Sequence, residues 1–373
     1  MLFYLGEKLV SVWGPFRLLT SHLMLLAMGT LASGLVVWLL LPRLWNRLPR
    51  DCGKAHAADG GVASKGKPTG GGVLITLLVL PVIVLFVPMD LWQFGVLCCL
   101  YLSMLFGYLD DRSVVAWGRW QKGLLDAGIA LVAAGCVHAS CGAEMWFPFV
   151  KHGVMVPVYI YLPLAVILLW VTTNATNCSD GVDGLAGSLT LLSLFAMAGL
   201  LYGVVGYKPI ADYLLIPTSP GAARWAILVS SVAGGLAGYL WYNAEPSRVL
   251  MGDAGSRFLG LLVGVTVLVA GNPFLIFVIA PVVLVNGGTG LLKLTLLIIL
   301  RKLGFDVRVT HELTQEEADK QHVLVKSLHS IRFPLHDHCR KNLKWSNSQV
   351  LIRFVLLQAF LTPLLFVILT KVR

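Results

Sequence analysis

Five aspartates stand in three short polar segments of a 373-residue chain that is 57% hydrophobic. The segments span residues 107–112, 174–184 and 251–256, and their aspartates are Asp110, Asp111, Asp180, Asp183 and Asp253. An ionised side chain inside a bilayer costs roughly 2.5–3.5 kcal/mol on insertion scales, so such residues usually have a function and a partner. Carboxylates favour Mg²⁺ or Mn²⁺ over Zn²⁺, and Mg²⁺ commonly binds one or two of them together with substrate phosphates. The five aspartates therefore predict a cation site for phosphate chemistry.

Glycines accompany the second and third segments, at Gly181, Gly184, Gly252 and Gly255. Glycine adopts positive φ readily, so these positions can place backbone amides against phosphate oxygens. The alternative is that the aspartates cap helix ends and bond to glycine-rich turns. Capping explains one isolated segment well, but it explains three segments on one face of a membrane poorly.

The elements that must position these segments are apolar runs of membrane-spanning length. We expect spans near residues 21–41, 72–88, 91–108, 122–138, 157–173, 184–205, 223–242, 255–271, 273–300 and 350–370. The ninth run is long enough to be tilted or broken. The sequence thus predicts an all-α integral membrane protein of about ten transmembrane helices, forming one polytopic domain over residues 1–373.

Lysine and arginine are concentrated in alternate loops, which indicates the orientation of the chain. We expect cytoplasmic loops near residues 42–71, 109–121, 174–183, 243–254 and 301–349, and both termini on the periplasmic face. The three aspartate segments then share the cytoplasmic face, where we expect the active site. Most of the net charge of +10 also lies there, which suits anionic lipids and anionic substrates.

The seven cysteines include no Cys-x-x-Cys pair, which favours a role as small core residues. Cys136 and Cys141 are the only two close enough in sequence to leave a disulfide open. His336 and His338 lack further zinc ligands at a standard spacing, so a phosphate or sugar contact is favoured. The polar residues 310–330 before them favour a solvated surface helix or flap over direct contact with substrate.

Together with Lys67-Pro-Thr-Gly-Gly-Gly72 and the His-Asp-His tail, the three segments resemble the signature motifs of the polyprenyl-phosphate N-acetylhexosamine-1-phosphate transferases. The resemblance covers residues 40–370 in motif order and span number. Among the branches of this family, residues 334–354 are most similar to the phospho-N-acetylmuramoyl-pentapeptide transferases.

This resemblance implies a reaction and a location. The enzyme would transfer phospho-N-acetylmuramoyl-pentapeptide from its UDP-activated form to undecaprenyl phosphate, giving lipid I and UMP for peptidoglycan synthesis. It would require Mg²⁺ and lie in the bacterial cytoplasmic (inner) membrane. Nucleic acid is not among its expected partners. A homodimer is considered, although the sequence does not fix the oligomeric state.

The resemblance also implies a role for each matching residue. Asp253 matches the metal ligand, and Asp110 matches the position proposed as base or nucleophile. The remaining catalytic matches are Asp111, Asp180, Asp183 and Lys122. The substrate-binding matches are Lys65, Thr69, Asn174, Asn177, His336 and His338. The sequence leaves open whether transfer takes one step or passes through a covalent intermediate.

Two features depart from the branch. Asp337 stands where its members carry the middle one of three histidines, and the loop before it is longer than usual. Both features bear on the sugar nucleotide, so an N-acetylglucosamine-1-phosphate transferase that uses UDP-N-acetylglucosamine is the alternative enzyme. An ion-coupled secondary transporter is disfavoured, because the aspartates lie at the ends of their spans and no inverted repeat is evident.

Overall fold

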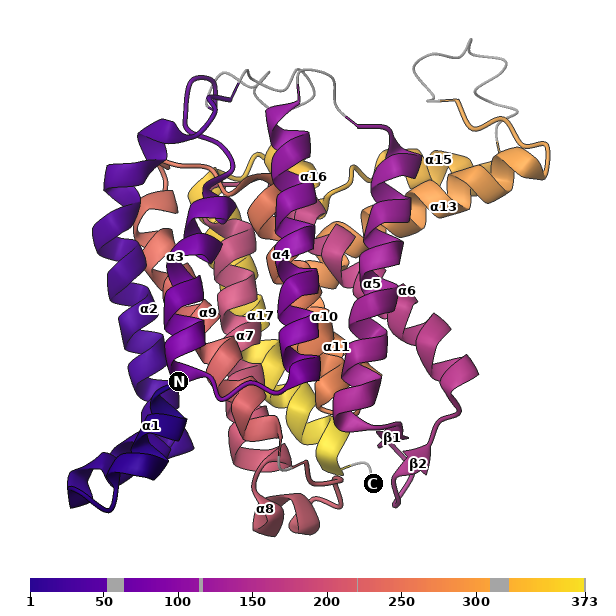
Figure 1. Ribbon diagram of the computed structural model, residues 1–373. Coiled ribbons are helices and arrows are strands. Elements are labelled where there is room, and N and C mark those ends of the chain that lie inside the picture. Colours follow the sequence, from indigo (N-terminus) through magenta and orange to yellow (C-terminus); the bar gives the residue numbers. More distant parts are fainter. Residues whose placement is uncertain (52–63, 114–116, 220, 309–321, 372–373) are drawn as a thin grey trace.

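The computed structural model describes residues 1–51, 64–113, 117–219, 221–308 and 322–371. Most of residues 310–330, for which we expected a surface helix or flap, lie outside these ranges. The described chain is almost entirely helical, and most of its long helices run side by side (Figure 1). Its strands are β1 (Glu144–Met145) and β2 (Val154–Met155), which pair antiparallel. The all-α prediction is confirmed.

Ten of the helices have at least fourteen residues. They are α2 (His22–Leu44), α3 (Gly71–Phe86), α4 (Leu91–Arg112), α5 (Arg119–Cys141), α6 (Val158–Ser179), α7 (Leu185–Leu200), α9 (Ala222–Asn243), α10 (Gly252–Val269), α13 (Thr289–Lys302) and α17 (Asn347–Lys371). The shorter ones are α1 (Leu2–Leu9), α8 (Lys208–Tyr213), α11 (Ile276–Ile279), α12 (Pro281–Val283), α15 (Val323–Ser330) and α16 (Leu335–Lys341). Tighter 3₁₀ segments span Gly14–Thr20, Trp45–Arg47 and Pro273–Leu275, and wider π segments span Leu201–Val205 and Leu284–Gly288.

Within the described residues, nine helical stretches are long and apolar enough to cross a membrane. The sixteen-residue helix α3 is apolar but shorter. These ten elements match the ten predicted spans, so the protein is a multi-pass membrane protein. Which end of the bundle faces the cytoplasm stays a prediction.

The ninth span, predicted at residues 273–300 and long enough to be tilted or broken, is broken into several helical segments. Pro281 lacks the amide hydrogen that a continuous helix needs, and α11 ends just before it. The carbonyl of Ile279 at the break accepts hydrogen bonds from Ser193 Oγ at 2.7 Å and Gln358 Nε2 at 3.2 Å. Beyond the π segment Leu284–Gly288, α13 leaves the bundle at an angle and has no buried residue (Figure 1).

Two details differ from the sequence prediction. Residues 174–179 were expected in a loop, but they form the last turns of α6. Polar side chains within a helix can bond back to a carbonyl one turn earlier, as Asn174 Nδ2 does to the Trp170 carbonyl at 2.9 Å. The disulfide left open between Cys136 and Cys141 is not formed, because both are free thiols.

Small residues let α2 and α9 pack backbone to backbone. A Cβ atom added at Gly234 would lie 2.0 Å from the Thr30 carbonyl oxygen, and one at Gly238 would lie 2.5 Å from that of Gly34. Such contacts are typical of membrane helices, which associate through close packing because lipid gives little hydrophobic drive between them.

We expect Gly234→Ala to lower the free energy of unfolding in detergent by about 1–3 kcal/mol, because the added methyl group has no room. Gly135→Ala is the matched control, since a Cβ atom there meets nothing within 4 Å. Equal unfolding temperatures for the two variants would contradict the close packing of α2 and α9.

Candidate active site

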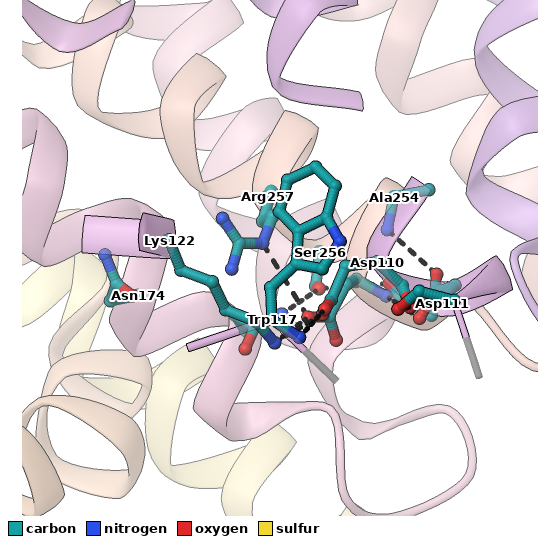
Figure 2. A network of polar contacts seen from close by, with 12 residues as sticks. Asp110, Asp111, Trp117, Lys122, Asn174, Ala254, Ser256 and Arg257 are labelled. Carbon is teal, nitrogen blue, oxygen red and sulfur yellow. Dashed lines mark hydrogen bonds and ion pairs between the residues drawn. The ribbon is translucent and has the colours of Figure 1, made fainter. Parts of the chain in front are cut away.

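Lys122, in the first turn of α5, joins two of the three aspartate segments. Its ammonium donates to Asp110 Oδ2 at the end of α4 and lies 3.7 Å from Asp253 Oδ2 at the start of α10. The other oxygen of Asp110 accepts a hydrogen bond from the Trp117 amide at 3.0 Å. Figure 2 shows the side chains of Lys122 and Asp110 meeting beside the labelled residues of α10. Three candidate residues from three helices therefore form one charged cluster.

Asp111 has a different environment from its neighbour Asp110. Its two carboxylate oxygens accept hydrogen bonds from the amides of Asp253 and Ala254, each at 3.2 Å (Figure 2). These amides belong to the first turn of α10, whose donors have no partner within the helix. Gly252 before them has a φ of +73° and leaves no space for a side chain beside Asp111. Asp111 thus caps α10, which is the role that we weighed as the alternative.

The second aspartate segment contacts a different lysine. Asp183 Oδ2 lies 3.4 Å from Lys67 Nζ and accepts a hydrogen bond from the Ser247 amide at 3.0 Å. Lys67 Nζ also donates to Ser247 Oγ at 2.9 Å. Asp180, at the C-terminal cap of α6, is half-buried. The Lys-Pro-Thr-Gly motif contributes Lys67 to this group, a contact that our residue assignments missed.

The glycine run packs against the third aspartate segment. The amides of Gly71 and Gly72 donate to the carbonyls of Leu250 and Met251, at 2.8 and 3.0 Å. Thr69 is held by its backbone amide, which donates to the Pro49 carbonyl at 2.9 Å.

Of the two predicted ligands in this loop, Thr69 follows Pro68, whose carbonyl accepts a hydrogen bond from the Leu250 amide at 2.8 Å next to the third segment. Lys65 is exposed at the surface.

Both predicted asparagines bind protein groups. Asn177 Nδ2 donates to Ser256 Oγ at 3.0 Å, which links α6 to α10. Asn174 Nδ2 donates to Asp126 Oδ2 at 3.3 Å. Asp126 was not among the predicted residues, although it stands one helical turn after Lys122 on α5. Opposite charges four residues apart, as at Lys122 and Asp126 and again at Asp253 and Arg257, lie on one helix face. This spacing in the sequence could have identified Asp126.

His336 is buried and contacts the broken ninth span. Its amide donates to Asn286 Oδ1 at 2.9 Å, and its Nδ1 lies 3.1 Å from the same oxygen. A Cβ atom on Gly181 would lie 2.2 Å from His336 Nε2, so the ring rests on the turn between α6 and α7. Burial lowers the pKa of His336 to about 4; Asp337 opposes this shift and Arg340 adds to it. At neutral pH the ring is therefore uncharged.

The other two members of the His-Asp-His motif are less buried. His338 Nδ1 accepts a hydrogen bond from the Arg332 amide at 3.4 Å. Asp337 Oδ1 lies 3.9 Å from Arg340 Nη1 and 3.9 Å from His336 Nε2. The Asp337 carboxylate therefore lies near both the imidazole of His336 and the guanidinium of Arg340.

Carboxylates of the charged cluster fit a hard divalent cation. In the part of the chain that the structure describes, no three His, Cys, Asp or Glu side chains converge as a complete metal site would. Asp110 and Asp253 nevertheless approach the same ammonium group, so their oxygens face one small region. Two carboxylates completed by substrate phosphates are a common set of Mg²⁺ ligands.

Comparison with known proteins agrees with these motifs. Residues 93–271 match Glycosyl transferase family 4. The phospho-N-acetylmuramoyl-pentapeptide-transferase of Treponema pallidum (strain Nichols) is 42% identical over 365 residues, which cover 97% of this chain and 94% of that protein. Those of Opitutus terrae and Borrelia turicatae are 26% and 29% identical, over 95% and 82% of this chain and 95% and 82% of their own lengths.

We expect Asp111→Ala to lower the free energy of unfolding by about 0.5–2 kcal/mol, because the first turn of α10 loses its acceptors. Denaturant unfolding in detergent measures this change. Asp306→Ala is the control, since this aspartate is exposed and pairs with Arg308, two residues along the chain. If the two variants are equally stable, Asp111 does not cap α10.

The buried His336 predicts a pH-dependent stability. Between about pH 6.5 and 4 the unfolded chain binds a proton that the folded chain does not, so stability is lost as the pH falls through this window. The loss is on the order of 3 kcal/mol from this residue. We expect His336→Asn, whose amide can still bond to Asn286, to flatten the decline in unfolding temperature between pH 7 and 5. A decline as steep as in the wild type would contradict the prediction.

Proposed function

The chain belongs to the phospho-N-acetylmuramoyl-pentapeptide-transferase family, and from this membership we propose its reaction. It is a multi-pass membrane transferase that moves phospho-N-acetylmuramoyl-pentapeptide from the UDP-activated precursor to undecaprenyl phosphate. The products are lipid I and UMP. The observation that carries the proposal is 42% identity over 97% of the chain, because this span covers the three aspartate segments, two of which contribute to the charged cluster.

The charged cluster suits a reaction between two anions. Lys122 supplies a fixed positive charge between Asp110 and Asp253, at the place where a phosphate and a diphosphate must approach each other. We assign Asp253 to hold one Mg²⁺ ion, and Asp110 lies beside it on the same ammonium group. When bound, this ion neutralises charge that develops on the diphosphate. Lys122 adds a charge-assisted donor to the same oxygens.

The chemical step is a substitution at the β-phosphorus of the UDP-sugar. An oxygen of undecaprenyl phosphate forms the new bond to this phosphorus, and the bond to the bridging oxygen breaks, so the electron pair leaves with UMP. Asp110 positions the attacking phosphate and can accept its proton. Its orientation is fixed by the Trp117 amide and by Lys122, so little reorganisation is needed during the step.

The second group of contacts suits the nucleotide sugar. Lys67 and Asp183 tie the glycine loop to the turn after α6, beside the candidate Asp180. His336 supports this turn from its other side, as an uncharged ring against Gly181. We assign Asp180, Asn177 and Thr69 to substrate binding, with Lys65 and His338 at the edge of the site.

The location follows from the substrates. Undecaprenyl phosphate is a membrane lipid, and the nucleotide precursor is a soluble anion, so the site must lie at a membrane surface. We place the charged cluster at the cytoplasmic face of the bacterial inner membrane, in agreement with the basic loops at residues 42–71 and 301–349. The homodimer stays a prediction.

The relatives' names favour this sugar nucleotide over UDP-N-acetylglucosamine, although Asp337 interrupts the histidine motif. We expect purified protein with Mg²⁺ and undecaprenyl phosphate to release UMP from UDP-N-acetylmuramoyl-pentapeptide and not from UDP-N-acetylglucosamine. Asp253→Ala should abolish release while the protein remains folded in the membrane. Turnover of UDP-N-acetylglucosamine alone would assign the chain to the other branch, and an active Asp253→Ala would remove Asp253 from the site.

A further inference from the structure

Two ion pairs of opposite polarity lie one above the other between α5 and α10. Lys122 and Asp126 are four residues apart on α5 and therefore lie on the same face of this helix. Asp253 and Arg257 have the same spacing on α10. Lys122 faces Asp253 at 3.7 Å, and Arg257 Nη1 donates to Asp126 Oδ1 at 2.6 Å. The proposed function uses the ion pair of Lys122 and Asp253. It assigns no role to the second ion pair, of Arg257 and Asp126.

The second pair is deeply buried. The side chains of Arg257 and Asp126 are 6% and 3% exposed, and both lie within candidate membrane spans. Replacing a buried ion pair by apolar groups of similar size is often neutral or stabilising, so such a pair is weak evidence for stability alone. Charged residues inside a membrane protein generally mark a functional region. The position of this pair directly beneath Asp253 indicates which function it serves.

The guanidinium of Arg257 reaches two carboxylates at once. Its Nη1 is used by Asp126, whereas its buried Nε has no hydrogen-bond partner among the described residues. This Nε lies 3.7 Å from Asp253 Oδ2 and is thus directed at the proposed metal ligand (Figure 2 shows Arg257 beside the charged cluster). Arginine makes this double contact through two different nitrogens of a rigid, planar fork, whereas a lysine at this position would have one ammonium nitrogen on a flexible stem.

Asp126 is itself held in place from a third helix. Its second oxygen accepts a hydrogen bond from Asn174 Nδ2 at 3.3 Å, and the same nitrogen donates to the Trp170 carbonyl at 2.9 Å. A continuous series of contacts therefore leads from α6 through Asn174, Asp126 and Arg257 to the Asp253 carboxylate. Asn174 acts within this series and does not need to touch substrate.

We propose that Arg257, oriented by Asp126 and Asn174, is a positioning residue that fixes the Asp253 carboxylate for a divalent cation. The inference rests on the proposed function, in which Asp253 is the metal ligand. Partners of metal ligands commonly change metal affinity or activity by about 10–100-fold when removed. A pair that only joins α5 to α10 would change unfolding and leave cation binding alone.

Arg257→Lys separates these two roles. Lysine keeps the positive charge and can pair with Asp126, but it lacks the second, rigidly placed nitrogen that approaches Asp253 in the wild type. We expect the apparent Kd for Mn²⁺, measured by electron paramagnetic resonance on the substrate-free protein, to rise by about 10–100-fold. The unfolding temperature in detergent should stay close to that of the wild type. UMP release should need correspondingly more Mg²⁺, with the KM for the UDP-sugar unchanged.

A second variant covers the case in which Arg257→Lys folds poorly. Asp126→Asn with Arg257→Met removes both charges, so no unpaired charge stays buried, and the net charge is unchanged. We expect the same loss of Mn²⁺ affinity. The matched control is Asp90→Asn with Arg224→Met, which removes a 3.4 Å ion pair between α4 and α9 at the opposite end of the bundle. This control should bind Mn²⁺ as the wild type does.

The inference is overturned if either Arg257 variant binds Mn²⁺ with wild-type affinity, if the control weakens binding equally, or if the wild type binds no Mn²⁺. Failure of the proposed function gives a different result. The wild-type protein would then bind Mn²⁺ and release no UMP from either UDP-sugar.

Discussion

An ammonium group between two carboxylates holds the proposed reaction centre of this protein together. Asp110 and Asp253 come from helices α4 and α10, and because both side chains are largely buried they would repel each other without Lys122 of α5. Coulomb energies grow as the effective dielectric falls, so this pairing matters more here than on a wetted surface. The ends of three membrane helices are thereby held in one arrangement, with a fixed positive charge at the proposed meeting place of the anionic substrates.

Close backbone packing makes that arrangement possible. A Cβ atom at Gly107 would lie 2.5 Å from the carbonyl oxygen of Asp253, and one at Gly72 would lie 2.1 Å from the amide of Gly255. Helices α3 and α4 can therefore approach the first turn of α10 more closely than larger side chains would allow. The same approach brings Asp111 to the free amides of α10, so adjacent aspartates of one segment perform different tasks.

The histidine motif is connected to the site through the broken ninth span. Asn286, in the π segment Leu284–Gly288, accepts both contacts from His336, and the ring of His336 rests against Gly181. A regular helix through this stretch would carry its side chains in a different register. The break therefore does more than redirect α13: it ties α16 to the turn that presents Asp180 and Asp183.

The membrane class, the helical spans and the three polar segments could be predicted from the sequence, because apolar length and isolated charges are local properties of a chain. The sequence also identified Lys122, Asp110 and Asp253 through their motifs. Which groups pair became visible in the folded chain alone: Asp111 with the amides of α10, Lys67 with Asp183, and Asp126 with Arg257. These partners are 116 to 143 residues apart in the sequence, so their meeting depends on how closely the helices pack.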